Sequence, residues 1–313
     1  VSLSAVEKLV TKTGAQMASA PGEALWTAAC SPALLLHEHT WVRSAAARVL
    51  GLRLRSTSWV APLARLRALT DAQVRALAAD TEGATLAEQA VRNLIALARC
   101  LAEVSEEDGA ALGADMSDDA DGEEQEPVEG ADDEGAATLG TDGDGAALGW
   151  MLARVARLSA QGGDLQARYA LEAVAGVAAS VAGERLVPHA RVLLRPVMRG
   201  KAIARAAAQR EADAVAKRRF RKMGQKRSLH VFEEAEEEAF RAAEAEAMKA
   251  EGDILRSVGA LASEVEALLS DVLGTEAFVD GVTALKKAKK AKEDERKRKR
   301  AVGALLDPQA DAR

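Results

Sequence analysis

Aromatic residues are scarce in this chain. Its 313 residues include four Trp, four Phe and one Tyr, so aromatics make up 3% of the composition, while 48% of all residues are hydrophobic. β-Sheets favour β-branched and aromatic side chains, whereas Ala and Leu favour helices. The scarcity therefore argues against a sheet-based core and favours closely packed helices built from Ala, Leu and Val.

Cysteine is also scarce, and long apolar runs are missing. The two cysteines, Cys30 and Cys100, are isolated; they exclude a disulfide framework and a zinc-ligand pattern, and suit a reducing compartment. Without a run of about 18 apolar residues, we expect no membrane partner. We see no secretory leader. Because Val1 already lies in a helical pattern, we expect the chain to be a piece of a longer protein.

Positive charge is absent from one segment, residues 105–145. This segment holds sixteen Asp or Glu residues and no Lys or Arg, and its apolar residues show no periodicity. Such a composition buries too little apolar surface to offset the entropy of ordering, so we expect a disordered acidic linker. Outside it, 42 Lys and Arg face 32 Asp and Glu, which makes the remainder of the chain basic by ten charges.

The rest of the sequence has the periodicity of amphipathic helices. We predict an all-α chain that forms a HEAT-like helical-repeat solenoid, interrupted by the acidic linker and ended by a basic C-terminal helix. The predicted units are helical repeats over 1–104, the linker over 105–145, further repeats over 146–199, a charged helical or partly disordered insert over 200–250, and a packed helix with a basic helical tail over 251–313.

Three helix boundaries follow from local signals. Thr70-Asp-Ala-Gln73 has the spacing of a capping box, which predicts a helix start at Thr70. The helix after Pro188 is expected to end at about Arg199, before the charged insert. Gly274 is expected to end a helix, and Thr275 to begin the last one, which runs to about Arg300.

The segment from His37 to Leu50 contains two candidate features. His37-Glu38-His39 is a candidate metal site, but a zinc site needs three or four ligands, and the other histidines lack matching spacing. We therefore favour a polar turn between helices. The pattern that follows resembles the second helix of a HEAT repeat. Its proposed structural residues are Trp41, Val42, Arg43, Ala46 and Leu50.

In this HEAT-like helix, Val42, Ala46 and Leu50 are expected to fill the seam between helices. Arg43 is expected at the edge of the seam, where it can satisfy carbonyl groups or a carboxylate. We predict that Trp41 is mostly buried, as a wedge between two helices of one repeat. An ordinary amphipathic helix is the alternative to a repeat.

Catalytic motifs are missing from the sequence. It contains no G-x-S-x-G nucleophile elbow, no glycine-rich phosphate loop and no paired Cys and His. We therefore expect a protein that is not an enzyme and that has no cofactor, no bound metal and no small-molecule substrate.

The basic tail over residues 286–300 carries ten Lys or Arg and three acids. Such a helix suits the electrostatic binding of RNA phosphates, a nuclear import signal, or both; a solvated helix end is the alternative. No aromatic residue is interleaved, so we do not expect base stacking. The candidate RNA-binding residues are Lys286, Lys287, Lys289, Lys290, Lys292, Arg296, Lys297, Arg298, Lys299 and Arg300.

An ordered series of segments resembles a known family. The segments are HEHTWVRSAAARVLG, LGWMLARVARLSAQ with ARYALEAVAGVAA, and LLSDVLGTEAFVDGV with RKRKRAVGALLDPQADAR. Together they are similar to the C-terminal region of the U3 small nucleolar RNA-associated protein 20 family, long HEAT-repeat scaffolds of the small-subunit processome. The resemblance covers most of residues 1–199 and 254–313. It departs from the family pattern at residues 200–250 and at Val282, where an aromatic is expected.

The resemblance implies a non-enzymatic scaffold that assembles the small-subunit processome and supports processing of the small-subunit rRNA. It implies pre-rRNA or snoRNA and processome proteins as partners, and a location in the nucleus and nucleolus. The alternative is a HEAT-repeat adaptor in transport or signalling that binds only protein. Salt-sensitive RNA binding by the tail distinguishes the two functions.

Overall fold

The computed structural model describes residues 20–55, 61–79, 84–104, 147–224 and 257–306. Within these ranges every element is helical and no strand occurs, which confirms the prediction of an all-α chain. The predicted acidic linker, residues 105–145, lies outside the described residues, as does residue range 225–250 of the predicted insert.

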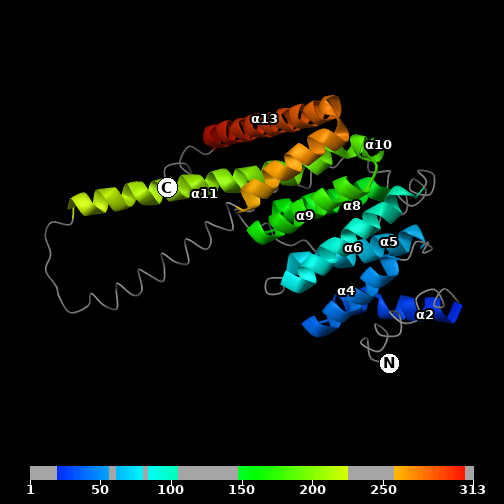
Figure 1. Ribbon diagram of the computed structural model, residues 1–313. Coiled ribbons are helices and arrows are strands. Elements are labelled where there is room, and N and C mark those ends of the chain that lie inside the picture. The colour runs from blue at the N-terminus through cyan, green and yellow to red at the C-terminus, as the bar shows by residue number, and fades with distance from the viewer. Residues whose placement is uncertain (1–19, 56–60, 80–83, 105–146, 225–256, 307–313) are drawn as a thin grey trace, which may run out of the picture.

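The helices follow one another in layers (Figure 1). The first layers contain α2 (Ala20–Ala29), α3 (Pro32–Leu35), α4 (Thr40–Leu54), α5 (Leu63–Ala79) and α6 (Ala84–Ala102). The next contain α8 (Ala147–Gln161), α9 (Asp164–Ser180), α10 (Gly183–Leu186) and the 3-10 turn η2 (Val187–His189). The last contain α11 (Ala190–Gly224), a helix over 257–273, and α13 (Thr275–Leu306).

Helix α6 joins the two ends of the fold. It packs against α4 and α5 on one side and against α8 and α9 on the other, and Leu94, Leu97 and Ala98 on it are fully buried. A Cβ atom at Gly176 of α9 would lie 2.1 Å from Cδ1 of Ile95. Glycine at this position therefore lets α6 and α9 pack at close range, and one apolar core continues through the layers.

A buried polar cluster lies where α4, α5 and α6 meet. The Asn93 side-chain amide donates to the Ala47 carbonyl at 2.9 Å and to Oε1 of Gln73 at 3.3 Å. Its Oδ1 accepts from Nε2 of Gln89 at 2.9 Å. Asn93 and Gln73 are 0% and 1% exposed. Because a buried amide is costly unless it is hydrogen-bonded, this cluster fixes the register of the three helices.

We predict that Asn93→Ala lowers the free energy of unfolding by roughly 1–3 kcal/mol, since it leaves the buried Gln73 amide without its donor. Gln89→Ala is the control, because Gln89 is only half-buried and the change removes one hydrogen bond of about 1 kcal/mol. Urea unfolding followed by helical circular dichroism measures both. Equal stability of Asn93→Ala and the parent chain would show that the cluster does not hold the helices in register.

The predicted helix start at Thr70 is wrong. Helix α5 begins at Leu63 and passes through Thr70, which is fully buried. The Thr70 hydroxyl donates to the Leu66 carbonyl at 2.8 Å, one turn earlier. Gln73 belongs to the buried cluster rather than to a cap. A capping-box spacing inside a helix is thus satisfied by a hydroxyl that bonds back to its own helix.

The predicted helix end at Arg199 is also wrong, because α11 continues to Gly224. Residues just past Arg199 are held by the helix over 257–273. A Cβ atom at Gly200 would lie 2.9 Å from Cβ of Ala262, one at Gly259 would lie 2.5 Å from Cβ of Ala204, and Lys201 forms an ion pair with Glu266. Tertiary packing from distant residues therefore carries the helix past the predicted boundary.

The predicted helix end at Gly274 and helix start at Thr275 are confirmed. Gly274 has a φ of 78°, a left-handed conformation that glycine adopts without strain. Helix α13 begins at Thr275 and runs to Leu306, six residues beyond the expected end. The positive φ reverses the chain between the helix over 257–273 and α13. As a result, α13 lies beside α11 at the outer edge of the fold (Figure 1).

Candidate functional site

The basic residues of the tail lie on a continuous helix, α13. The side chains of Lys286, Lys287, Lys289 and Lys290 are exposed, and that of Lys292 is half-buried. Lys299 and Arg300 lie in the helical backbone of α13, but their side chains fall outside the described residues. The other exposed bases of the tail are Arg296, Lys297 and Arg298.

The first turns of α13 fix this basic helix to the fold. A Cβ atom at Gly281 would lie 2.8 Å from Cδ1 of Leu194 on α11, so the two helices touch at close range. Phe278, Val282 and Leu285 pack against the core. The fifteen residues after Leu285 extend about 22 Å at 1.5 Å per residue. The packed turns over residues 278–285 thus anchor the helix, and the exposed basic residues follow them.

The HEAT-like residues of α4 behave as predicted at three positions. Val42, Ala46 and Leu50 are 6%, 0% and 0% exposed. Arg43 satisfies carbonyl groups, as expected, but those of the preceding turn: it donates to the His37 and Glu38 carbonyls at 2.8 Å each. The guanidinium group therefore closes the turn between α3 and α4.

The prediction that Trp41 is buried is wrong. Its side chain is 70% exposed and stacks on the His39 ring, with ring centroids 6.3 Å apart. Trp41 lies in the first turn of α4, seven residues before Arg48. Residues seven apart point in nearly the same direction on a helix, and Arg48 is exposed. Trp41 is therefore on the solvent side of the stripe that its neighbour Val42 begins.

Trp26 of α2 has the buried position between two helices that was predicted for Trp41. It is 3% exposed and belongs to the main core. The guanidinium carbon of Arg53 on α4 lies 5.4 Å from the Trp26 ring centroid, a cation–π contact between the two helices. The local signal was an apolar set at helical spacing, formed by Leu25, Trp26 and Ala29 of α2 and by Cys30 directly after it.

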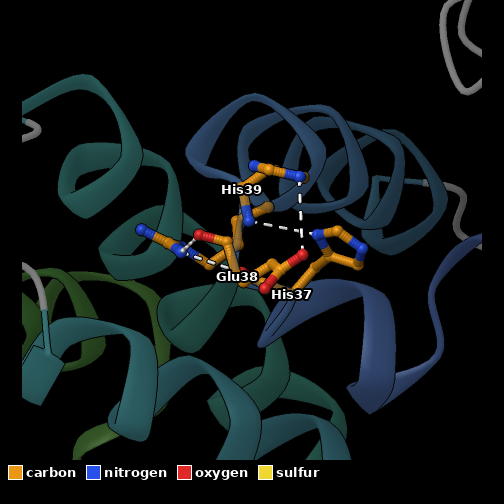
Figure 2. A network of polar contacts seen from close by, with 4 residues as sticks. His37, Glu38 and His39 are labelled. Carbon is orange, nitrogen blue, oxygen red and sulfur yellow. Dashed lines mark hydrogen bonds and ion pairs between the residues drawn. The ribbon is translucent and has the colours of Figure 1, made fainter.

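The His37-Glu38-His39 segment forms the polar turn between α3 and α4 (Figure 2). Nδ1 of His37 accepts from the backbone N–H of His39 at 3.1 Å, and Nε2 of His39 lies 3.5 Å from the Glu38 carboxylate. Across the described part of the chain, no group of three or more His, Cys, Asp or Glu residues could hold a metal ion.

An arginine-rich seam lies between α5 and α8, and sequence reasoning missed it. The Arg154 guanidinium forms an ion pair with Asp71 at 2.9 Å. It also lies 4.4 Å from the Trp150 ring centroid, and Arg67 lies 5.3 Å from the same ring. Burial lowers the pKa of Arg154 from its ordinary value, Asp71 opposes this, and Arg157, Arg75 and Arg67 lower the pKa further.

This seam had a signal in the sequence. Trp150, Arg154 and Arg157 are spaced four and three residues apart. Residues at this spacing share one face of a helix. Arg67, Asp71 and Arg75 have the same relation on α5, at steps of four. Each helix therefore carries an arginine-containing stripe that the sequence alone shows, although only the fold shows that the two stripes meet.

No helix in the described ranges is long and apolar enough to cross a membrane. The chain matches no protein-family model and no curated protein.

Proposed function

We propose that this chain is a non-enzymatic scaffold in ribosome biogenesis. In this proposal its helical layers form a HEAT-like solenoid that contacts other proteins of the small-subunit processome. Its basic helix contacts the phosphate backbone of pre-rRNA or snoRNA, and the chain supports small-subunit rRNA processing in the nucleolus. The sequence resemblance and the charge of α13 support this proposal.

The observation that carries the RNA contact is the row of exposed lysines on α13. Lys286, Lys287, Lys289 and Lys290 all face solvent directly after the anchored turns. A rigid helix holds these charges at fixed spacing, so binding RNA requires little further ordering of the backbone. Ammonium groups that neutralise phosphates release condensed counterions, and this release drives binding without any contact to bases.

The layered packing supports the role of a scaffold. Helices that are near in the chain pack against one another, from α4 with α6 through α8 with α9 to α11 with α13. This order is typical of helical repeats, in which each repeat contacts its neighbours and the stack presents a long surface. Such a surface suits an assembly factor that holds several partners.

Crosslinking followed by sequencing of the bound RNA tests the proposal. We expect small-subunit pre-rRNA or snoRNA to be enriched, with crosslinked peptides from α13. A variant with Lys286, Lys287, Lys289 and Lys290 changed to Gln should lose most of this RNA. If no RNA is recovered above background, the adaptor that binds only protein becomes the correct description of the chain.

One observation favours that adaptor as the second candidate. Trp41 and Leu36 are 70% and 39% exposed, and both lie at the α3–α4 end of the fold. Exposed Trp side chains are enriched among the residues that dominate protein–protein binding. Contact through this end and recruitment of RNA by α13 are compatible, but only RNA recruitment distinguishes the two functions.

A further inference from the structure

A hollow of about 280 Å³ opens at the α8–α9 turn, beside α5. It lies at the end of the arginine-rich seam, and no residue of the basic helix α13 lines it. Both polar and apolar side chains line it. The lining residues used below are Val74 and Ala78 of α5, Arg154, Arg157 and Leu158 of α8, and Gln166 of α9.

The charges around this hollow are unbalanced. Arg154 and Arg157 line it, Arg67 and Arg75 are close enough to act on the Arg154 guanidinium, and Asp71 neutralises Arg154 through their ion pair. Asp164, in the first turn of α9, adds a second negative charge nearby. The hollow therefore keeps a net positive charge that an anionic group would neutralise.

Arg154 and Arg157 differ in how they are held. Arg154 is fixed by Asp71 and by the Trp150 ring. Arg157 also lines the hollow, yet among the described residues it has neither a hydrogen bond nor an ion pair. Its guanidinium group retains its full set of donors, and these match the two oxygens of a carboxylate. Arg157 is thus the residue that a ligand would engage first.

The start of α9 adds donors of the same kind. Its N-cap is Gly163, which has no side chain to cap the helix, and the first helical bond runs from the Ala167 N–H to the Gly163 carbonyl. The amides before Ala167 have no acceptor within the helix. A Cβ atom at Gly162 would lie 2.5 Å from Cβ of Gln166, so glycine keeps this turn tight.

We propose that this hollow binds the carboxylate of a glutamate side chain in an acidic segment of a partner protein. Val74, Ala78 and Leu158 provide an apolar wall for the methylene groups of that side chain, which a bare phosphate does not use. Arg157 forms the bidentate contact, and Arg154 supports it from the seam. This site goes beyond the proposed function and does not depend on RNA binding by α13.

Fluorescence anisotropy with a labelled hexaglutamate peptide tests the proposal on the full chain. Arg157→Gln should weaken binding about 10-fold or more, the usual loss when a hydrogen bond to a charged group is removed. Arg168→Gln is the matched control: Arg168 is an exposed arginine on α9 that pairs with Glu172 at 2.9 Å, and its loss should change binding less than about 2-fold.

A second variant tests the site independently, in case Arg157→Gln does not fold. Gln161→Glu places a negative charge in the exposed wall of the hollow, and it should weaken hexaglutamate binding by repulsion while thermal unfolding stays unchanged. Equal loss in Arg157→Gln and Arg168→Gln would overturn the site, because it would show only general attraction to positive charge. Hexaglutamine that binds as tightly as hexaglutamate would overturn it too. Binding of hexauridylate that depends on Arg157, without hexaglutamate binding, would assign the hollow to RNA instead.

Discussion

Trp26→Ala is expected to lower the free energy of unfolding by roughly 3–5 kcal/mol, the usual cost of emptying a large aromatic site in a core. Trp26 is 3% exposed and joins α2 to α4 through the Arg53 guanidinium. Its removal leaves a cavity and also leaves the buried Arg53 without its aromatic partner. Urea unfolding followed by helical circular dichroism measures the loss.

Trp41→Ala is the matched control for this prediction. The indole of Trp41 is 70% exposed, so its removal should change stability by no more than about 0.5 kcal/mol. The two variants remove the same side chain from two neighbouring helices, and only its burial differs. If Trp41→Ala destabilised the chain as much as Trp26→Ala, the exposed position of Trp41 in the fold would be wrong.

The two tryptophans show what periodicity can and cannot predict. The stripe on α4 was predicted correctly at Val42, Ala46 and Leu50, because residues three and four apart share a face. Trp41 is adjacent to that stripe, and its size made it the obvious candidate for burial. Its side chain instead points to solvent, as does that of Arg48 seven residues later. One residue of offset moves a side chain by about 100° around a helix.

The fold class was predictable for a simpler reason. Few aromatics, few prolines and many Ala and Leu residues favour a core built from helices, and every element within the described residues is helical. Gly274 was predictable because a left-handed residue at a helix end requires glycine or Asn. The continuation of α11 past Arg199 was not, since it depends on Ala262 and Glu266, more than sixty residues away.

The candidate sites were predictable to different degrees. The basic helix was evident from composition, because ten bases within residues 286–300 need no tertiary information to be noticed. The arginine-rich hollow depends on two helices separated by the acidic segment, α5 and α8. Each charged stripe was visible alone, but their meeting at Asp71 and Arg154 follows from the packing of both helices on α6.

Neutralising the basic helix is expected to give the largest change in RNA binding. The variant has Lys286, Lys287, Lys289 and Lys290 changed to Gln, which keeps a good helix former at each position. These four side chains are exposed, so the helix and its anchor at Gly281 should be unaffected. Loss of four phosphate contacts should weaken binding at low salt by roughly 100-fold or more.

A variant with the same change in charge elsewhere is the control. Arg48, Arg92, Arg99 and Arg168 are all exposed, and none lies on α13. Their change to Gln removes the same total charge from the chain. If binding depended on net charge alone, the two variants would lose affinity equally. If α13 is the contact, the control variant should lose less than about 3-fold, since distant exposed charges are screened by salt.

A salt titration of RNA binding by the intact chain and these two variants tests the central claim most directly. With about five phosphates engaged, log affinity should fall against log salt with a slope of roughly -3.5 to -4.5, whatever the RNA sequence. The slope of the α13 variant should be less negative by about 3, because each of its four lost phosphate contacts reduces the magnitude of the slope by about 0.7–0.9. The control variant should keep the parent slope. An α13 variant with unchanged affinity and slope would contradict RNA binding by α13. The adaptor that binds only protein would then be the better description of the chain.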